Sequence, residues 1–418
     1  MDKLTIGPKA ACSSQRIVLS RLLGPVAVLC AVSLLVAGTS AGATSGGSTR
    51  RAVTVVGTSF RNGSCSSRYY CTVLATLDVR GSEDVVWREH ASKWTILQVL
   101  HARSLSAVSC PTATWCMAVG TQPGPHVDTQ PTDTTFAEAV TDSRVVVKLP
   151  VPRQSSELTA ISCVSASSCV AVGDDQQRQF GESETLAERW DGTSWSLMSP
   201  AGGFSDDLLT SVSCSGTDHC VAIGYNVSGG RPVAEVWDGG AWSLRVAPRV
   251  AWKRPKCPPG ALGCFSPPAA FEMVSCGGPT YCMALGGILN DTQFADLWNG
   301  TRWVKIIPPQ LLFDHGVFVR LSSLSCVRHR CLTVGQLILA NAIQPFAIEW
   351  TGSRWVDVSA RSFSKYQHGS LNAVGCTSVS YCIAIGSAES GDAMHTPFGF
   401  LAVLSAGHWT LGPSVVKK

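Results

Sequence analysis

The sequence predicts an all-β fold: a single seven-bladed β-propeller of four-stranded antiparallel blades, with one disulfide in each blade. Three observations support this prediction. A pair of cysteines recurs seven times along the 418-residue chain, with four or five residues between its members. The first cysteines of successive pairs lie 45–62 residues apart, and a period near fifty residues is typical of repeat architectures. Each period also contains two hairpin patterns, which together supply the four strands of a blade.

The first hairpin of each repeat surrounds the cysteine pair. In the third repeat its two arms are residues 158–163 and 169–173, and similar segments recur in the fourth to seventh repeats. Both arms are short, rich in β-branched residues, and bounded by Ser, Gly and Asp, which predicts strand, turn and strand. Cysteines that face each other at the mouth of such a hairpin are close enough for a disulfide. On the second arm Ala171 and Gly173 share one face, and we expect this small face to let the next blade approach closely.

The second hairpin carries two tryptophans around a turn that contains glycine, most often as Asp-Gly or Asn-Gly, which are strong hairpin signals. The pairs are Trp190/Trp195, Trp237/Trp242, Trp298/Trp303 and Trp350/Trp355. The first, second and seventh repeats depart from this pattern: Val140 and Val145 replace both tryptophans in the second, and Leu404 is paired with Trp409 in the seventh. We expect the paired tryptophans to fill the gaps between blades, because they bury large areas.

Two structural alternatives remain open from the residues alone. A tandem array of β-sandwiches is the alternative fold, but a repeat near fifty residues is short for a sandwich domain of about 100 residues. A propeller must also close its ring, and residues 53–57 look like an extra strand that would join the last blade. The last repeat already has four strands of its own, so the sequence leaves the mode of closure undecided.

Residues 1–43 have the pattern of an export signal. Basic residues precede an uncharged, mainly apolar run over 22–37, and the small residues of 41–43 fit a cleavage site. We therefore expect a signal peptide at 1–43 and the propeller at 44–418. The alternative is an uncleaved membrane anchor, although the apolar run is shorter than the roughly twenty residues that a span needs. Either way the protein is expected to be secreted or attached to the outer face of the plasma membrane.

Export explains the cysteines, because thiols oxidise to disulfides outside the cytoplasm. Sixteen of the 18 cysteines follow residue 43, and an even number fits complete pairing. The predicted disulfides are Cys65–Cys71, Cys110–Cys116, Cys163–Cys169, Cys214–Cys220, Cys257–Cys264, Cys276–Cys282, Cys326–Cys331 and Cys376–Cys382. Zinc is the alternative, but seven equivalent pairs spread around a ring do not supply four converging ligands to one metal. We expect neither a metal nor a cofactor.

These motifs resemble known repeat proteins. A strand that ends in Gly, followed by a turn with Trp, resembles kelch-type propellers, although the kelch double glycine is reduced to one. The Asp-Gly turn resembles the Asp-box of sialidase-like propellers, with a spacing one residue shorter. The Val-Ser-Cys…Cys-x-Ala-Val-Gly repeats resemble exported actinobacterial β-propeller repeat proteins over nearly all of residues 44–418. This resemblance implies a fold and export rather than an activity.

In a propeller, the connections between the second and third strands and those between blades share one face, which we call the variable face. Binding residues usually lie on such loops. The longest connection includes a basic and aromatic set together with the predicted disulfide Cys257–Cys264. The members of the set are Trp252, Lys253, Arg254 and Lys256. It is either a rigid loop that contacts an anionic or glycan ligand, or a surface insertion held by its disulfide.

A second set of candidates consists of His and acidic residues predicted in loops of the variable face. Its members are His126, Asp174, Asp175, Asp206, Asp207, Asp314, His315, His368 and His395. Because they come from several blades, they could converge into an acid/base or metal site. The alternative is a scatter of solvated polar loops, and no metal-ligand spacing supports a site. The Pro- and Thr-rich stretch 122–134 is expected to be a mobile loop.

Charge and motifs narrow the possible functions. The net charge is +4, and residues 1–43 contribute four bases and one acid, so the remaining chain is nearly neutral. A nearly neutral chain lacks the strongly basic surface that binds nucleic acids. Common catalytic motifs and the sialidase Arg-Ile-Pro motif are missing. We therefore expect a monomeric, non-catalytic propeller that binds a glycan or a protein partner and meets the membrane only through an uncleaved N-terminal segment. The alternatives are a sialidase-like or other glycoside hydrolase or lyase, and a structural spacer.

Overall fold

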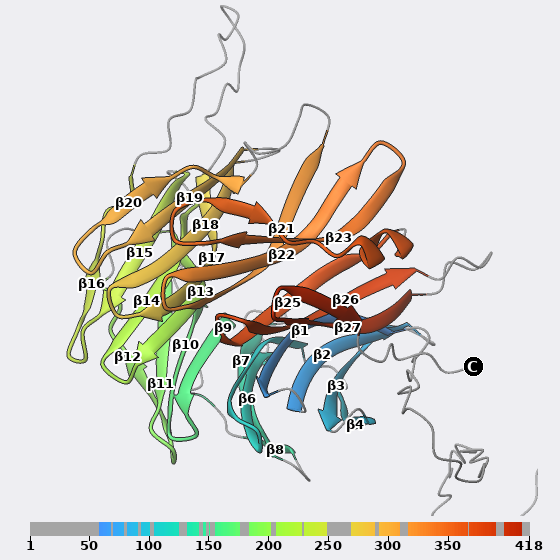
Figure 1. The fold of residues 1–418 in the computed structure, drawn as a ribbon. Helices are drawn as coiled ribbons and strands as arrows, with labels where there is room; N and C mark the ends of the chain where they lie inside the picture. The colour runs from blue at the N-terminus through green and yellow to red at the C-terminus, as the bar shows by residue number, and fades with distance from the viewer. Residues whose placement is uncertain are drawn as a thin grey trace, which may run out of the picture. The chain divides into compact units, whose positions relative to one another are not determined.

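The computed structural model describes the chain from residue 58 to residue 411 with internal gaps. The described ranges are 58–67, 70–78, 82–90, 93–100, 104–124, 132–141, 145–147, 150, 155–175, 184–201, 206–227, 230–248, 269–288, 292–309, 317–366, 368–389 and 397–411. All of them belong to one compact unit, Arg50–Lys418. They form seven sheets of four antiparallel strands, which confirms the predicted all-β propeller (Figure 1). Within these ranges, no helix has the length and apolar character needed to cross a membrane.

Each blade consists of four consecutive strands. Blade 1 comprises β1 (Thr58–Ser67), β2 (Tyr70–Asp78), β3 (Ser82–His90) and β4 (Lys93–Leu100), and blade 2 comprises β5 (Ser104–Thr112), β6 (Trp115–Pro123), β7 (Asp133–Thr141) and β8 (Val145–Val147). Blade 3 comprises β9 (Ser156–Ser165), β10 (Ser168–Asp175), β11 (Glu184–Trp190) and β12 (Trp195–Met198), and blade 4 comprises β13 (Asp207–Gly216), β14 (His219–Asn226), β15 (Arg231–Trp237) and β16 (Trp242–Leu244). Blade 5 comprises β17 (Ala269–Gly278), β18 (Tyr281–Ile288), β19 (Thr292–Trp298) and β20 (Trp303–Ile306). Blade 6 comprises β21 (Phe318–Val327), β22 (Arg330–Leu339), β23 (Ala342–Trp350) and β24 (Trp355–Asp357), and blade 7 comprises β25 (Ser370–Ser378), β26 (Tyr381–Glu389), β27 (Pro397–Ser405) and β28 (His408–Leu411). A short 3-10 helix, η2 (Arg361–Lys365), lies between blades 6 and 7.

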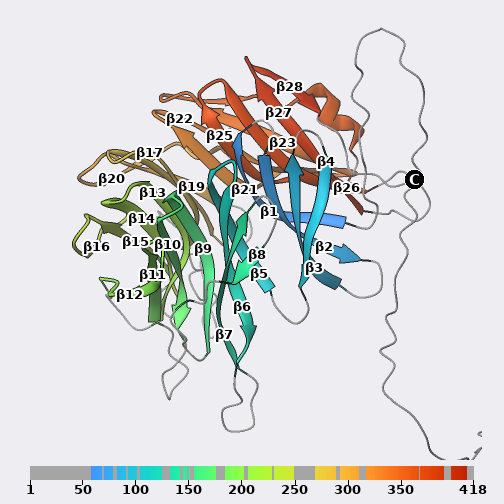
Figure 2. The same cartoon turned by 90° about the horizontal axis from the view of Figure 1, so that it is seen from below.

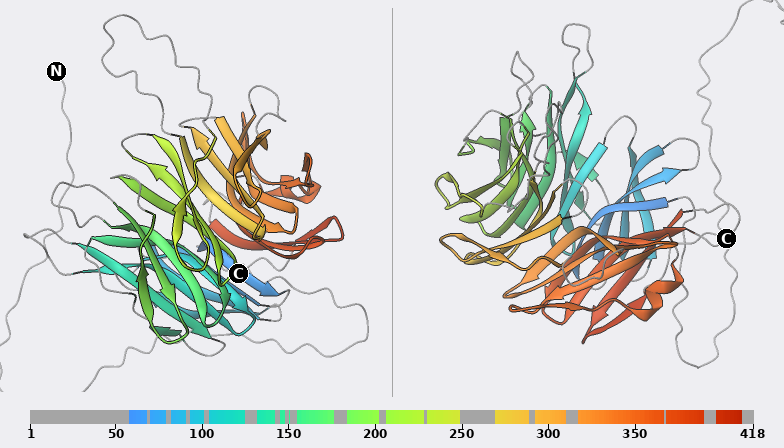
Figure 3. Two further views of the ribbon diagram at one scale, coloured as in Figure 1. Left: turned by 90° about the vertical axis from the view of Figure 1, so that its left-hand side faces the viewer. Right: turned by 90° about the horizontal axis from the view of Figure 1, so that it is seen from above.

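The ring closes by packing of the first blade against the last. Neighbouring innermost strands contact each other around the ring, and β1 contacts β25, β26 and β27. The blue strands of blade 1 lie beside the red strands of blade 7 (Figure 2 and both views of Figure 3). Asn372 of β25 donates its side-chain amide to the carbonyl oxygen of Phe60, and the Phe60 N–H donates to Ser387 Oγ at 2.9 Å. Among the described strands none is exchanged between blades, and residues 53–57 lie outside them.

A bulge recurs in the innermost strand and accounts for the glycine at the end of the repeat motif. In blade 4 the register shifts between Leu209 and Ser211, and a Cβ on Gly224 would lie 1.8 Å from the carbonyl oxygen of Leu208. The equivalent glycines Gly120, Gly173, Gly286, Gly335 and Gly386 show the same approach at 1.9–2.3 Å. The glycine makes room for a carbonyl of the innermost strand in its own blade, which the sequence reasoning did not anticipate. On the same small face, Ala171 packs in a cluster with Met117 and Val119 of blade 2.

The Ser-Cys dipeptide links successive blades. In each link, the N–H of the first cysteine of one blade donates to the hydroxyl of the serine that precedes the first cysteine of the blade before it. This bond joins six successive pairs of blades at 2.8–3.0 Å. The donor and acceptor pairs are Cys110/Ser64, Cys163/Ser109, Cys214/Ser162, Cys276/Ser213, Cys326/Ser275 and Cys376/Ser325. A side chain of the repeat motif thus holds neighbouring innermost strands together where no sheet hydrogen bond connects them.

The seventh link, between blades 7 and 1, has Gly375 in the position of the serine. A Cβ on Gly375 would lie 3.6 Å from the oxygen of Cys65 and 3.9 Å from its nitrogen, which is ordinary van der Waals contact. We expect Gly375→Ser to place a hydroxyl beside the Cys65 N–H and to raise the free energy of unfolding by about 0.5–1.5 kcal/mol. Urea unfolding measures the change. Gly375→Ala is the control, and an equal gain in both variants would contradict a new hydrogen bond.

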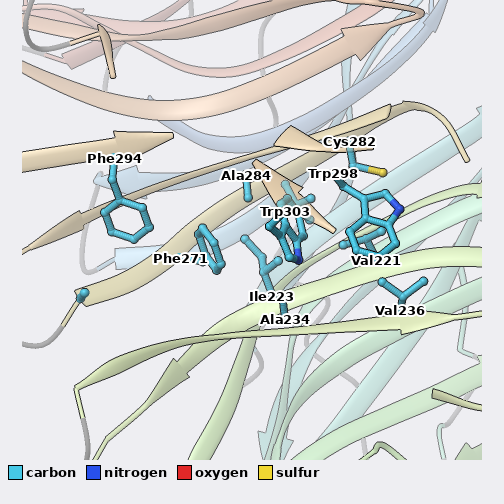
Figure 4. Packing of buried hydrophobic residues seen from close by; sticks show 12 residues of the cluster. Val221, Ile223, Ala234, Val236, Phe271, Cys282, Ala284, Phe294, Trp298 and Trp303 are labelled. Carbon is cyan, nitrogen blue, oxygen red and sulfur yellow. The ribbon is translucent and has the colours of Figure 1, made fainter. Parts of the chain in front are cut away.

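The core lies between neighbouring blades. At the interface of blades 4 and 5, Trp298 and Trp303 pack with Val221 and Ile223 of blade 4 (Figure 4). The two indole rings have their centroids 5.7 Å apart, and the three other tryptophan pairs are arranged alike at 5.4–5.7 Å. The prediction that paired tryptophans fill the gaps between blades is confirmed.

The disulfides of the seven repeats all form across the first hairpin of a blade. Each joins the first strand to the second, and only two residues separate these strands in every blade. We call the face that carries these hairpin turns the disulfide face. The eighth predicted disulfide, Cys257–Cys264, lies outside the described residues. The prediction of one disulfide per blade is confirmed.

Candidate functional site

The variable face differs from blade to blade. The connection between the second and third strands has two residues in blade 6 (340–341) and nine in blade 2 (124–132). The connections between blades range from three residues (101–103) to twenty-four (245–268). The disulfide face has the same short first turn in every blade. The propeller therefore combines a uniform frame with one face whose connections vary in length and composition, and such connections commonly carry function.

The candidate acids of this face lie at the ends of strands rather than in loops. Asp174 and Asp175 belong to β10, Asp207 belongs to β13, and all three are buried. Asp206 and His368 lie just before innermost strands and have φ values of 69° and 58°. The prediction of loop positions is thus wrong for the three buried acids. The other candidates, His126, Trp252, Lys253, Arg254, Lys256, Asp314, His315 and His395, lie outside the described residues.

The buried acids close the end of the first hairpin in blades 3 and 4. Asp175 Oδ1 accepts a hydrogen bond from Ser156 Oγ at 3.0 Å. At the equivalent place in blade 4, Asp207 Oδ1 accepts from Asn226 Nδ2 at 2.7 Å and from the Arg231 guanidinium at 3.4 Å. These bonds hold the two strands together where the chain leaves the sheet. The two carboxylates are therefore structural groups that lie beneath the variable face.

Glu157 forms a carboxyl pair with Asp174, and the sequence reasoning missed it. It lies directly opposite Asp174 in the register of β9 and β10, and the two side chains are hydrogen-bonded. Partial burial raises the pKa of Glu157, and the carboxyl groups of Asp174 and of Asp133 in blade 2 raise it further. A carboxyl pair of this kind holds a proton more tightly than an isolated carboxylate, so it can donate as well as accept.

The described candidates fall into separate groups. Asp174 and Asp175 join Glu157 on blade 3, Asp206 and Asp207 lie on blade 4, and His368 lies in the connection to blade 7. Across the described ranges, no three or more His, Cys, Asp or Glu side chains are grouped in a way that could hold a metal ion. The arrangement offers one coupled carboxyl pair on blade 3, above strand ends that buried acids hold together in blades 3 and 4.

A second set of acids missed by sequence reasoning lies in the middle of the third strands. Glu138, Glu188, Glu235 and Asp296 occupy equivalent positions in blades 2–5, and each is at most 2% exposed. Glu235 Oε2 accepts a hydrogen bond at 2.9 Å from the N–H of Ala201, in the connection that leaves blade 3. The bond shows that such an acid can secure the chain between blades, which is a structural role.

Asp296 makes folding dependent on pH. Burial raises the pKa of Asp296 to about 6, and Lys305 on the adjacent strand lowers it. Because this folded-state pKa lies above the ordinary value of 3.8, the favourable contribution is complete below about pH 4 and is lost as the pH rises through 6. Between pH 4 and 7, wild type should lose roughly 1–3 kcal/mol of unfolding free energy relative to Asp296→Asn. Urea melts at several pH values measure this, and parallel pH profiles would contradict it.

Comparisons with protein-family models and with curated proteins return no match for this sequence. Among solved structures the chain is similar to Pyrococcus horikoshii acylaminoacyl peptidase, with 9% identity and a TM-score of 0.50, over 85% of this chain and 52% of that one. A prolyl endopeptidase is 12% identical with a TM-score of 0.48, over 84% of this chain and 49% of that one. The SapL1 lectin in complex with alpha-methyl fucoside is 10% identical with a TM-score of 0.40, over 87% of this chain and 96% of that one. The chain spans about half the length of the two peptidases. At these identities the likeness concerns the fold alone. The seven four-stranded sheets of the chain itself define its class, a seven-bladed β-propeller.

Proposed function

We propose that this chain is an extracytoplasmic, non-catalytic binding propeller that recognises a glycan or a protein partner through its variable face. The observation that carries the proposal is the contrast between the two faces. The disulfide face repeats one short turn seven times, whereas the connections of the variable face range from two to twenty-four residues. A rigid frame under varied connections is a common way to present recognition residues.

The disulfides support a location outside the cytoplasm, where cysteine pairs stay oxidised. The proposed organisation is a cleaved signal peptide at 1–43 followed by the mature propeller at 44–418, secreted or held at the outer face of the membrane. The resemblance of the repeats to exported actinobacterial propellers with kelch-like and Asp-box-like turns agrees with this proposal. N-terminal sequencing of the exported protein tests it, and the expected first residue is Thr44.

Glu157 is the acid of blades 3 and 4 that a polar ligand can reach. Asp175 and Asp207 are buried, and their hydrogen bonds stiffen the strand ends beneath the variable face, so less conformational freedom is lost when a ligand binds there. Glu157, the more exposed member of the carboxyl pair, can accept from sugar hydroxyls or pair with a basic side chain. The basic and aromatic set at 252–256 belongs to this proposal as a loop that would stack on a sugar and bind an anion.

A thermal-shift panel on residues 44–418 tests the proposal against cell-wall glycans, sialosides and divalent metals. A rise of the midpoint with one glycan is expected, and Glu157→Gln should reduce it. Arg354→Gln, which removes an exposed charge from a turn on the disulfide side, is the matched control and should leave the rise intact. A rise with metal alone, reversed by a chelator, would instead support the His and Asp set. If no glycan acts, the protein partner is tested by pull-down with the same two variants.

One observation favours a second candidate, a glycoside hydrolase or lyase. Partial burial and the neighbouring carboxyl groups raise the pKa of Glu157, as a general acid on a sugar requires. Because Glu157 is hydrogen-bonded to Asp174, these two carboxyl groups are closer together than the roughly 5 Å or more between the two carboxyls of a glycosidase, so the second catalytic carboxylate would come from another residue. Hydrolysis of the bound sugar by wild type, lost in Glu157→Gln while binding persists, would support the enzyme. Binding without turnover in wild type would support the non-catalytic propeller.

A further inference from the structure

The hairpin turns of the disulfide face carry opposite charges on neighbouring blades. Each blade has two such turns, one between its first and second strands and one between its third and fourth. In blades 3 and 4 the residues of these turns include no base and three acids, Asp191, Asp218 and Asp238. In blades 5 and 6 they include no acid and three arginines, Arg302, Arg328 and Arg354. Because these blades follow one another around the ring, from green to orange in Figure 1, they form an arc with an acidic half and a basic half.

The second turn shows that this charge is separate from the fold. Blades 3 and 4 begin the turn with Asp and end it with Ser or Ala, whereas blades 5 and 6 begin it with Asn or Thr and end it with Arg. Asp191 Oδ1 accepts a hydrogen bond from the N–H of Ser194 at 2.8 Å. Asn299 Oδ1 accepts the equivalent bond from the N–H of Arg302 at 2.9 Å. An uncharged residue closes the turn as well as an acid does, so the turn itself requires neither sign of charge.

The six charged side chains are exposed, and none of them forms an ion pair within the described ranges. Hydrogen bonds from backbone N–H groups of the turns lower the pKa of Asp191 and of Asp238, so both are ionised at neutral pH. Next to the turns of blade 6, Arg330 and Glu349 neutralise each other at 2.7 Å. Arg189 is half-buried at the position of blade 3 that Glu349 occupies in blade 6, so this strand position also differs in sign between the two blades.

Arg328 is held in an unfavourable backbone conformation. Its φ is 55°, in the left-handed region, which costs a residue with a Cβ about 1–2 kcal/mol. Blade 6 alone has four residues between its paired cysteines, and its first hairpin lacks the irregularity that follows the first cysteine in blade 4. Glycine or asparagine would suit such a turn better. A strained arginine at an exposed position points to a role for its side chain on the surface.

A twofold rotation brings the acidic half of one copy onto the basic half of another. The axis lies in the plane of the ring, just outside the disulfide face, and passes between blades 4 and 5 and through blade 1. Rotation about it places blade 4 opposite blade 5 of the second copy, and blade 3 opposite blade 6. The second turns then meet as Asp238 with Arg302 and as Asp191 with Arg354. Blades 2 and 7 also face each other, and the residues between their paired cysteines are uncharged.

We propose that the disulfide face is the interface of a symmetric homodimer, in which blades 3 and 4 of each copy meet blades 5 and 6 of the other. A partner of one charge would use only half of the arc, whereas a second copy uses both halves. Each contact occurs twice in such an interface, and the complementary charges set its orientation. The proposal replaces the expectation of a monomer that the sequence alone suggested. The variable faces would point away from each other, so the dimer does not depend on the function proposed for them.

Sedimentation velocity of residues 44–418 tests the proposal. Exposed ion pairs are individually weak, so we expect wild type to dimerise with a Kd of the order of 0.1 mM or below at about 20 mM NaCl. Salt screens such pairs, and the Kd should rise about tenfold or more at roughly 500 mM NaCl. A wild type that stays monomeric at about 0.2 mM protein in low salt would overturn the proposal.

Two variants exchange turns of this chain for its own turns of the opposite charge. The all-acid variant gives blades 5 and 6 turns like that of blade 3, through Asn299→Asp, Arg302→Ser, Thr351→Asp and Arg354→Ser. The all-base variant gives blades 3 and 4 turns like that of blade 5, through Asp191→Asn, Ser194→Arg, Asp238→Asn and Ala241→Arg. Because like charges meet in either variant alone, its Kd should rise about tenfold or more. An equimolar mixture should dimerise as wild type does, since opposite charges then meet on both halves.

Arg361→Glu with Lys365→Glu is the matched control. It changes the net charge as much as the all-acid variant does, but on η2, in a connection of the variable face. This control should dimerise like wild type, and melting midpoints within a few degrees of wild type show that the variants are folded. Unchanged dimerisation of either exchanged variant alone, or a mixture that associates no more tightly than its components, would overturn the proposal.

Discussion

Gly224→Ala is expected to unfold the propeller or destabilise it severely, whereas Gly278→Ala should leave its stability nearly unchanged. A Cβ on Gly224 would lie 1.8 Å from the oxygen and 2.8 Å from the carbonyl carbon of Leu208. Both are backbone atoms of a strand that is packed between blades, so neither can rotate away. No atom lies within 4 Å of a Cβ on Gly278. We expect a loss of about 3 kcal/mol or more at residue 224, and a change within about 0.5 kcal/mol at residue 278.

Urea unfolding followed by tryptophan fluorescence measures both variants, since tryptophans lie at most interfaces between blades. The comparison separates the close approach in the bulge from the general entropic effect of replacing a glycine, because both variants lose the same glycine freedom. Equal losses in the two variants would mean that the innermost strand can move to accept a side chain.

The same close approach shapes the candidate site. A Cβ on Gly173 would lie 1.9 Å from the oxygen of Glu157, whose side chain meets that of Asp174. The glycine thus allows the backbone of β9 to approach β10 at the point where the two carboxyl groups interact. A variant that widened this gap would be expected to separate the pair and to return the pKa of Glu157 toward its ordinary value. Gly173 therefore supports both the packing of blade 3 and the interaction between Glu157 and Asp174.

The fold could be predicted from the sequence because its determinants are local and repeat. The paired cysteines mark one hairpin, the Asp-Gly and Asn-Gly turns mark another, and seven copies leave little choice of architecture. The role of the paired tryptophans followed from their size and regular position. Each of these signals lies within a few residues of the structure that it specifies, so no long-range information was needed.

The candidate site depended on register and on neighbouring blades, which the sequence did not reveal. The bulge in β9 decides that Glu157 faces Asp174, and a hairpin without the bulge would pair different residues.

Reduction of the disulfides is expected to lower stability more than any single substitution. Six of the seven described bridges join residues six apart in sequence, and the seventh joins residues five apart. The chain-entropy model assigns about 2 kcal/mol to a loop of this size. Seven such contributions are comparable with the total stability of an ordinary domain, about 5–15 kcal/mol. The reduced chain should therefore be largely unfolded at room temperature, or melt at least about 20 °C below the oxidised protein.

Circular dichroism melts measure this effect. They compare the oxidised protein with protein that has been unfolded, reduced and returned to native buffer containing reductant. Removal of a single bridge, as in Cys163→Ala with Cys169→Ala, is the graded control and should cost about one seventh of the total, because each bridge closes its own short loop. Thiol titration of the denatured, unreduced protein tests whether the cysteines are oxidised at all. Free thiols on most cysteines beyond residue 43 would contradict both the disulfides and the proposed export. Similar melting of the reduced and oxidised proteins would show instead that the bulges, serine links and tryptophans hold the ring without them.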